Sequence, residues 1–104
     1  MENEDLNERL VEALRDSLTN MLGEADTKTL FYFITKEFHV DLRELSDRVA
    51  DLHEAFVRIF GARAAVLLEN VVAKEFCNRL SQSYDPKETL YETVERTRRH
   101  RTRK

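Results

Sequence analysis

The sequence has 104 residues, of which 41% are hydrophobic and 36% are charged, with two Gly, one Pro, one Cys and no Trp. This length fits one domain with one modest core, and the scarcity of Gly and Pro argues against a turn-rich β-sandwich and against glycine-rich phosphate loops. A single cysteine cannot form an internal disulfide, which favours a reducing, cytoplasmic location. No apolar run reaches the roughly 18 residues that a membrane-spanning helix needs, so we expect no membrane partner.

The formal net charge of −3 is the average of two unlike parts. Residues 1–95 hold 20 acidic and 11 basic side chains, a balance of −9, whereas residues 96–104 hold six basic side chains and no acidic one. We therefore divide the chain into a helical domain over 1–95 and a basic C-terminal tail over 96–104. Because like charges repel and nothing apolar is present to bury, we expect the tail to be flexible. Its candidates for electrostatic contact are Arg96, Arg98, Arg99, Arg101, Arg103 and Lys104.

Two helices are predicted in the first third of the chain. Over residues 4–22 the apolar positions recur every three or four residues, which indicates an amphipathic helix: Leu6, Leu10, Ala13, Leu14, Leu18 and Met21. Gly23 follows at a position where a residue with positive φ often ends a helix. Asp26 is the expected N-cap of a second helix over residues 27–38. Most of its apolar side chains share one side, with Tyr32 opposite them.

A third helix is predicted over residues 42–60. Asp41 and Glu44 fit a capping box, with Asp41 as the N-cap and Glu44 reaching back. Ser46 offers an alternative start, which would open a separate segment. Gly61 is expected to end the helix. Its apolar stripe consists of Leu42, Leu45, Val49, Leu52, Phe56, Ile59 and Phe60.

The last two helices are predicted from an apolar face and from a start signal. Over residues 62–81 one face collects Ala62, Ala65, Val66, Leu68, Val72, Ala73, Phe76 and Leu80. The fifth helix is expected to begin at Asp85, with Pro86 at its first position and Glu88 at its third. Its short docking face consists of Leu90, Tyr91 and Val94.

One carboxylate falls where charge is least expected. On a helical wheel Glu69 lies near the middle of the fourth helix's apolar arc, where an ionised group is costly unless it is paired. His53 lies at the edge of the third helix's stripe and would reach Glu69 if the two helices pack antiparallel. The pair is a candidate acid–base or ligand site. The favoured interpretation is structural, with Glu69 paired in the core or at a dimer seam.

The sequence predicts neither a metal site nor a cofactor nor a catalytic residue. No two His or Cys residues stand three or four positions apart on a helix, as a metal site of that kind requires. The single Cys77 is expected to be a small core residue rather than a nucleophile. No nucleophile is placed beside His53 and Glu69 that would complete a catalytic set.

The central part of the chain resembles a group of small helical proteins from archaea. The resemblance lies in the segments Leu30–Ile34, Phe56–Gly61 and Leu67–Phe76, with Gly61 and Glu69 among the matched positions, and it covers roughly residues 10–82. It implies a compact helical fold. It implies no activity, and the basic tail lies outside it.

These observations predict an all-α protein, a compact bundle of four or five helices. Three surplus apolar side chains, Tyr32, Leu67 and Val71, favour a homodimer that covers them. The predicted function is a non-enzymatic regulatory or adaptor module that uses its basic tail for contacts with a protein partner. Two alternatives stay open: a nucleic-acid-associated protein that binds through the tail, and a ligand or acid–base site at Glu69 and His53.

Overall fold

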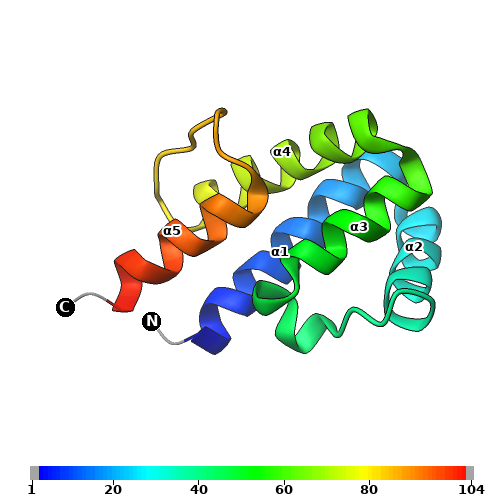
Figure 1. Cartoon of the computed structure of the whole chain (residues 1–104), viewed down its shortest axis with the longest axis horizontal. Helices are drawn as coiled ribbons and strands as arrows, with labels where there is room; N and C mark the ends of the chain where they lie inside the picture. Colours follow the sequence, from blue (N-terminus) through cyan, green and yellow to red (C-terminus); the bar gives the residue numbers. More distant parts are fainter. Residues whose placement is uncertain (1–2, 103–104) are drawn as a thin grey trace.

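The computed structural model describes the backbone of residues 3–102 and the side chains of residues 5–100. Within that range the chain has no strand and forms, in order, α1 (Asn3–Leu22), α2 (Glu24–Lys36), the 3₁₀ helix η1 (Leu42–Asp47), α3 (Val49–Phe60), α4 (Ala62–Arg79) and α5 (Leu90–Thr102) (Figure 1). The predicted all-α class is therefore confirmed. No helix in this range is both long enough and apolar enough to cross a membrane.

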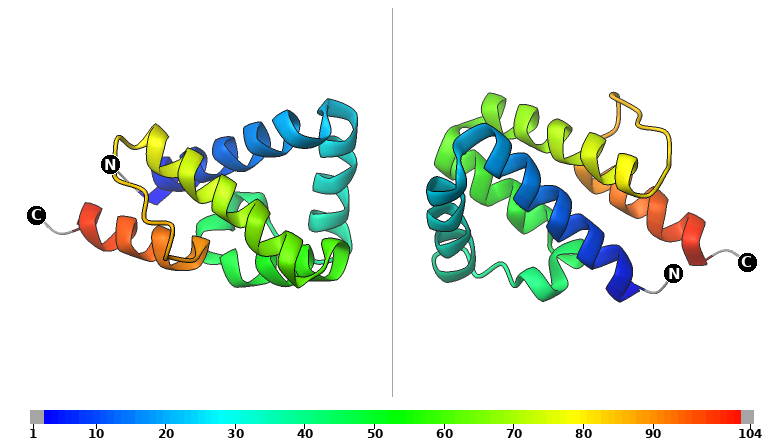
Figure 2. Two further views of the ribbon diagram at one scale, coloured as in Figure 1. Left: turned by 90° about the horizontal axis from the view of Figure 1, so that it is seen from above. Right: turned by 180° about the vertical axis from the view of Figure 1, so that it is seen from behind.

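Helix α4 is the central element of the bundle. It packs against α1 and α3, which run in the same general direction as each other and opposite to α4 (Figure 1). Helix α2 crosses one end of this layer and contacts α1, and α5 packs against the other half of α4 (Figure 2). The chain between α4 and α5 turns back along the bundle, so that α5 runs in the same direction as α4.

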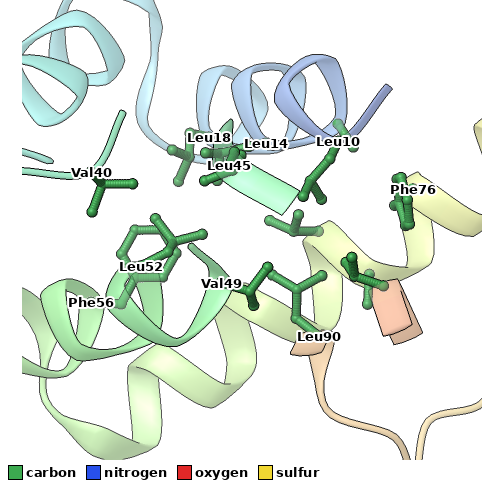
Figure 3. Packing of buried hydrophobic residues seen from close by; sticks show 14 of the residues in the cluster. Leu10, Leu14, Leu18, Val40, Leu45, Val49, Leu52, Phe56, Phe76 and Leu90 are labelled. Carbon is green, nitrogen blue, oxygen red and sulfur yellow. The ribbon is translucent and has the colours of Figure 1, made fainter. Parts of the chain in front are cut away.

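The core is formed by the stripes that the periodicity predicts. Figure 3 shows buried side chains from α1, η1, α3, α4 and α5 meeting in one cluster. Those labelled there are fully buried or nearly so: Leu10, Leu14, Leu18, Val40, Leu45, Val49, Leu52, Phe56, Phe76 and Leu90. Four large residues predicted to pack against the body are instead exposed: Met21 at 42%, Ile59 at 38%, Val66 at 48% and Tyr91 at 52%. Ala62, predicted for the same face as Val66, is exposed as well.

Two glycines make the sharp junctions between consecutive helices. Gly23 and Gly61 adopt φ of 91° and 93°, a conformation that other residues adopt only with strain. Each N–H closes the last turn of the helix before it, so the predicted helix ends are confirmed. The predicted N-cap Asp26 is wrong, because α2 begins at Glu24, directly after Gly23. Asp26 lies in the first turn, where its charge favours the helix dipole.

The predicted continuous helix over residues 42–60 is interrupted. Glu44 has non-helical angles inside η1, and the Asp41 carboxylate accepts the N–H two residues further on at 2.9 Å, so Glu44 does not complete a capping box. The cause is tertiary: the Asn7 side chain of α1 accepts the Ser46 N–H at 2.7 Å and holds this segment against α1. The alternative of a separate segment near Ser46 is therefore closer to the structure.

Helix α5 begins later than its start signal predicts. The Asp85 carboxylate accepts the Lys87 N–H at 2.9 Å and closes only a turn. The helix starts at Leu90, and Thr89 is its N-cap. The sequence Thr89 to Glu92 has the capping-box spacing and contains the signal that the prediction missed.

Candidate functional site

Helices α3 and α4 bring His53 and Glu69 together. The two residues lie sixteen positions apart and are equally distant in sequence from Gly61, where the chain reverses direction. In an antiparallel helix pair, residues equidistant from the turn stand at the same height. His53 Nδ1 and Glu69 Oε2 are 2.7 Å apart, a hydrogen bond. The contact that the sequence predicted for an antiparallel packing is confirmed.

The two members of the pair differ strongly in burial. The Glu69 side chain is 8% exposed, whereas that of His53 is 48% exposed. Burial raises the pKa of the Glu69 carboxyl, and the hydrogen bond and charge of His53 oppose this shift without cancelling it. Glu69 is thus the inner end of the pair and His53 the end in contact with solvent.

A cavity of about 350 Å³ lies against the pair. Its walls come from the first turn of α3, the middle of α4 and the segment 86–91 that leads into α5. Its lining is mainly apolar, with Val49, Val66, Leu90 and the Tyr91 side chain around the two polar residues. Mostly apolar cavities of this size with a few converging polar groups are typical small-molecule sites.

The hydrogen-bonding capacity of the pair is only partly used. Glu69 Oε1 and His53 Nε2 form no hydrogen bond with the described residues, and neither is among the fully buried polar atoms that lack a partner, so both atoms are open to solvent. The acidic Glu88 also lines the cavity, but it binds the Arg96 guanidinium at 3.0 Å, which neutralises its charge. Lys87 is exposed at the rim. The polar atoms that are available to a ligand at the cavity are therefore Glu69 Oε1 and His53 Nε2, together with the side-chain amide of Asn70.

The arrangement suits binding better than covalent chemistry. A carboxylate that orients an imidazole is half of a nucleophile-activating set, which also needs a hydroxyl or thiol at the imidazole. The hydroxyl of Thr89 lines the cavity but accepts the Glu92 N–H at 3.0 Å as a helix cap. Cys77 lies elsewhere in the core, and burial raises the pKa of its thiol. Within residues 5–100 no three His, Cys, Asp or Glu side chains are grouped to hold a metal ion.

The third wall of the cavity is the part of the site that sequence reasoning missed. This wall contains Pro86, Leu90 and Tyr91. Their segment was expected to form the fifth helix and to pack it against the body, not to line a cavity. The Thr89 to Glu92 spacing indicates where α5 begins, but no local signal shows which surface of the body its first turn faces.

The surplus apolar residues lie apart from this site. Tyr32 on α2 is 60% exposed, and Leu67 and Val71 on α4 are 62% and 44% exposed. Leu67 and Val71 are one turn apart and share the outer face of α4. Their exposure agrees with the prediction that they are more than one small core needs.

The basic segment begins as a structural part of the bundle. Residues 96–102 form the C-terminal half of α5, so the part of the tail within the described range is helical. Arg96 binds Glu88 at 3.0 Å and donates to the Ser83 carbonyl at 3.3 Å. Arg98 binds Asp47 of η1 at 3.0 Å and donates to a neighbouring backbone carbonyl. The contacts of these two arginines hold α5 against the rest of the bundle.

The remaining tail candidates are placed only in part. Arg99 is exposed on α5. The Arg101 side chain lies outside the described range, as do Arg103 and Lys104.

Comparison of the chain with protein-family models, with curated proteins and with solved structures gives no match.

Proposed function

We propose that this protein is a small-molecule-binding helical module, with its ligand held in the cavity beside His53 and Glu69. One observation carries the proposal: a nearly buried carboxylate, hydrogen-bonded at 2.7 Å to a half-exposed imidazole, forms part of the wall of a cavity of about 350 Å³.

Stability alone does not account for a carboxylate at this position. Apolar residues of similar volume usually stabilise a core at least as well as a buried ion pair, because the pair loses its hydration. A residue such as Met at position 69 would pack against Ala65 and Val72 without that cost. Buried titratable groups that line cavities cluster at functional sites, which supports a binding role.

The test is a fragment titration followed by amide NMR shifts. The expected result is that some small, mainly apolar fragments shift the amides of residues 49–53, 66–70 and 86–91 together and in a saturable way. Val66→Trp, which places a large ring in the cavity wall, should abolish these shifts. Leu67→Trp is the matched control, because its ring would lie on the outer face of α4, and it should bind as the wild type does.

Either of two results would overturn the proposal. One is the absence of saturable shifts with every fragment. The other is equal binding by the Val66→Trp variant and the wild type, which would place the fragments outside this cavity.

A second candidate function is a homodimeric adaptor, and the exposure of Leu67 and Val71 on one face of α4 favours it. A two-fold dimer across α4 would cover both side chains in each protomer. Light scattering should then give twice the monomer mass for the wild type and the monomer mass for Leu67→Lys. A monomeric wild type would exclude this candidate.

In this second proposal the basic segment supplies contacts with an acidic protein or with nucleic acid. Deleting residues 99–104 tests it while keeping the ion pairs of Arg96 and Arg98. Nucleic-acid binding should weaken steeply with salt and disappear in the truncated chain. Binding that does not depend on salt, or no binding at low salt, would exclude the nucleic-acid version.

A further inference from the structure

We infer that the ligand of this cavity is a small organic amine whose positively charged nitrogen binds the Glu69 carboxylate. The inference rests on the proposed function, since it names the chemical class of ligand for the same cavity. It follows from the unused oxygen of Glu69, from the distribution of charge around the cavity and from the character of its walls.

The Glu69 carboxylate has one oxygen that is open to the cavity. Glu69 as a residue is 6% exposed and its Oε2 is bound to His53, while Oε1 forms no hydrogen bond with the described residues and is not fully buried. A carboxylate accepts up to about four hydrogen bonds, so Oε1 can accept from a donor that enters the cavity. An ammonium group provides up to three donors and no acceptor, which suits a site that consists of a carboxylate.

The charges around the cavity favour a cation over an anion. The cavity's other acidic residue, Glu88, is neutralised by Arg96, and Lys87 lies at the exposed rim. The inner charge is that of Glu69, shared with the half-exposed His53. An anionic ligand at hydrogen-bond distance from Glu69 would be repelled in a medium of low dielectric constant, whereas a cation would be attracted.

The first turns of α3 and α5 also line the cavity. Their positive dipole ends weakly oppose the binding of a cation. Each helix N-terminus carries roughly half an elementary positive charge, which acts only over the first turn. At α5 the Glu92 side chain already accepts the Thr89 N–H at 2.9 Å, which uses part of that potential. The charge of the ionised Glu69 carboxylate outweighs these partial charges at the position of its own Oε1.

The walls of the cavity indicate the size and character of the rest of the ligand. Val49, Val66 and Leu90 provide apolar walls, and Tyr91 adds an aromatic ring. A cavity of about 350 Å³ is near the lower limit for small-molecule sites, so it suits a compact ligand of about ten non-hydrogen atoms. An amine on a short chain attached to an aromatic or branched aliphatic group meets these requirements.

The experiment compares three ligands of nearly equal shape: phenethylamine, 2-phenylethanol and 3-phenylpropanoate. Each is titrated into the full-length protein at neutral pH, and dissociation constants are taken from amide shifts of residues around the cavity. Phenethylamine should bind roughly tenfold more tightly than the alcohol, since a hydrogen bond between charged groups exceeds a neutral one by about that factor. The carboxylate should show no saturable binding.

Two variants separate the role of the carboxylate from the shape of the cavity. Glu69→Gln keeps the side-chain volume and removes the charge, so the amine and the alcohol should bind within about twofold of each other. Glu54→Gln is the matched control, because it makes the same substitution at an exposed position of α3 that does not line the cavity, and it should retain the preference for the amine. The comparison of the three ligands on the wild type remains decisive even if Glu69→Gln does not fold.

The outcomes distinguish the inference from the proposed function. If the alcohol or the carboxylate binds in the cavity as tightly as the amine, the inference is overturned and the proposed function stands. If none of the three shifts the residues around the cavity, and no other fragment does, the proposed function is overturned together with the inference.

Discussion

Thr89 and Glu92 cap the N-terminus of α5, because the side chain of each accepts a hydrogen bond from the backbone N–H of the other. Thr89 Oγ1 accepts the Glu92 N–H at 3.0 Å, and Glu92 Oε1 accepts the Thr89 N–H at 2.9 Å. This reciprocal pair is a capping box, and it satisfies two backbone donors that the helix leaves unpaired. It fixes the first residue of α5, Leu90, which is fully buried and contributes to the wall of the cavity. The cap thus connects a local sequence motif to the geometry of the candidate site.

Removing the cap should destabilise the protein. Thr89→Ala is expected to lower the free energy of unfolding by about 1 kcal/mol, the usual loss for an N-cap threonine. The control is Thr29→Ala, because the exposed Thr29 hydroxyl donates to the Ala25 carbonyl within α2 and caps no helix. It should leave stability unchanged or slightly higher, since Ala favours helix. Urea unfolding followed by circular dichroism measures both, and equal losses would contradict a capping role.

The stability contributed by Glu69 should depend on pH in a direction opposite to that of most carboxylates. Burial raises the pKa of Glu69 in the folded protein above its ordinary value of 4.5. The folded state therefore holds the proton more tightly than the unfolded state. The resulting stabilisation is present below the unfolded-state pKa and is lost as the pH rises through the folded-state pKa.

Glu69→Gln removes this titration. The free energy of unfolding of the wild type minus that of the variant should fall as the pH rises from the unfolded-state pKa through the raised folded-state pKa of Glu69. Urea unfolding at a series of pH values measures it. A difference that stays constant, or that grows with pH, would show that the hydrogen bond from His53 outweighs burial.

Arg79 should be the most important surface charge for stability. It binds Glu12 of α1 at 3.3 Å and Glu75 at 3.0 Å, and it also hydrogen-bonds Asp16 of α1. Its side chain is only 26% exposed, so these contacts are less screened than those of an isolated surface pair. Arg79→Met should lower the free energy of unfolding by about 1–2 kcal/mol.

The control for this prediction is a salt bridge that solvent surrounds. The Arg43 side chain, which binds Asp41 at 3.1 Å, is 89% exposed. Arg43→Met should change stability little, because exposed pairs contribute close to nothing. Similar losses for the two variants would show that the arginine at position 79 does not hold α1 to α4.

The helices themselves could be predicted because their information is local. The apolar spacing from Leu6 to Leu18 and the glycines at 23 and 61 are each readable within a few residues, and both kinds of signal are confirmed. The break near residue 48 was one of two alternatives that the local signals at Asp41 and Ser46 left open. It depends on a hydrogen bond between Asn7 and Ser46, which are 39 positions apart.

The candidate site could likewise be predicted only in part, where its information is local. His53 and Glu69 could be paired from sequence because the turn between their helices is short and lies midway between them. The cavity could not be predicted, because one of its walls comes from segment 86–91, and the position of that segment depends on how α5 docks. That docking uses Arg96 and Arg98, which the sequence presents as part of a uniform basic run.

Cys77 offers a direct measure of that docking. The residue is 1% exposed, burial raises the pKa of its thiol, and the Arg96 guanidinium of α5 lies 4.0 Å from the sulfur. Since the thiolate is the reactive form, the native thiol should react far more slowly with an aromatic disulfide reagent than the thiol of the urea-unfolded chain. Labelling in the native state then requires local opening of α5.

Arg96→Ala removes the contacts with Glu88 and Ser83 and should increase the rate of native-state labelling roughly tenfold, if the lost ion pair and hydrogen bond together contribute about 1.4 kcal/mol to docking. Arg63→Ala, at an exposed position in the first turn of α4, is the control and should label as the wild type does. The measurement is the absorbance of the released thiol against time. Equal rates for Arg96→Ala and the wild type would show that Arg96 does not hold α5 over Cys77.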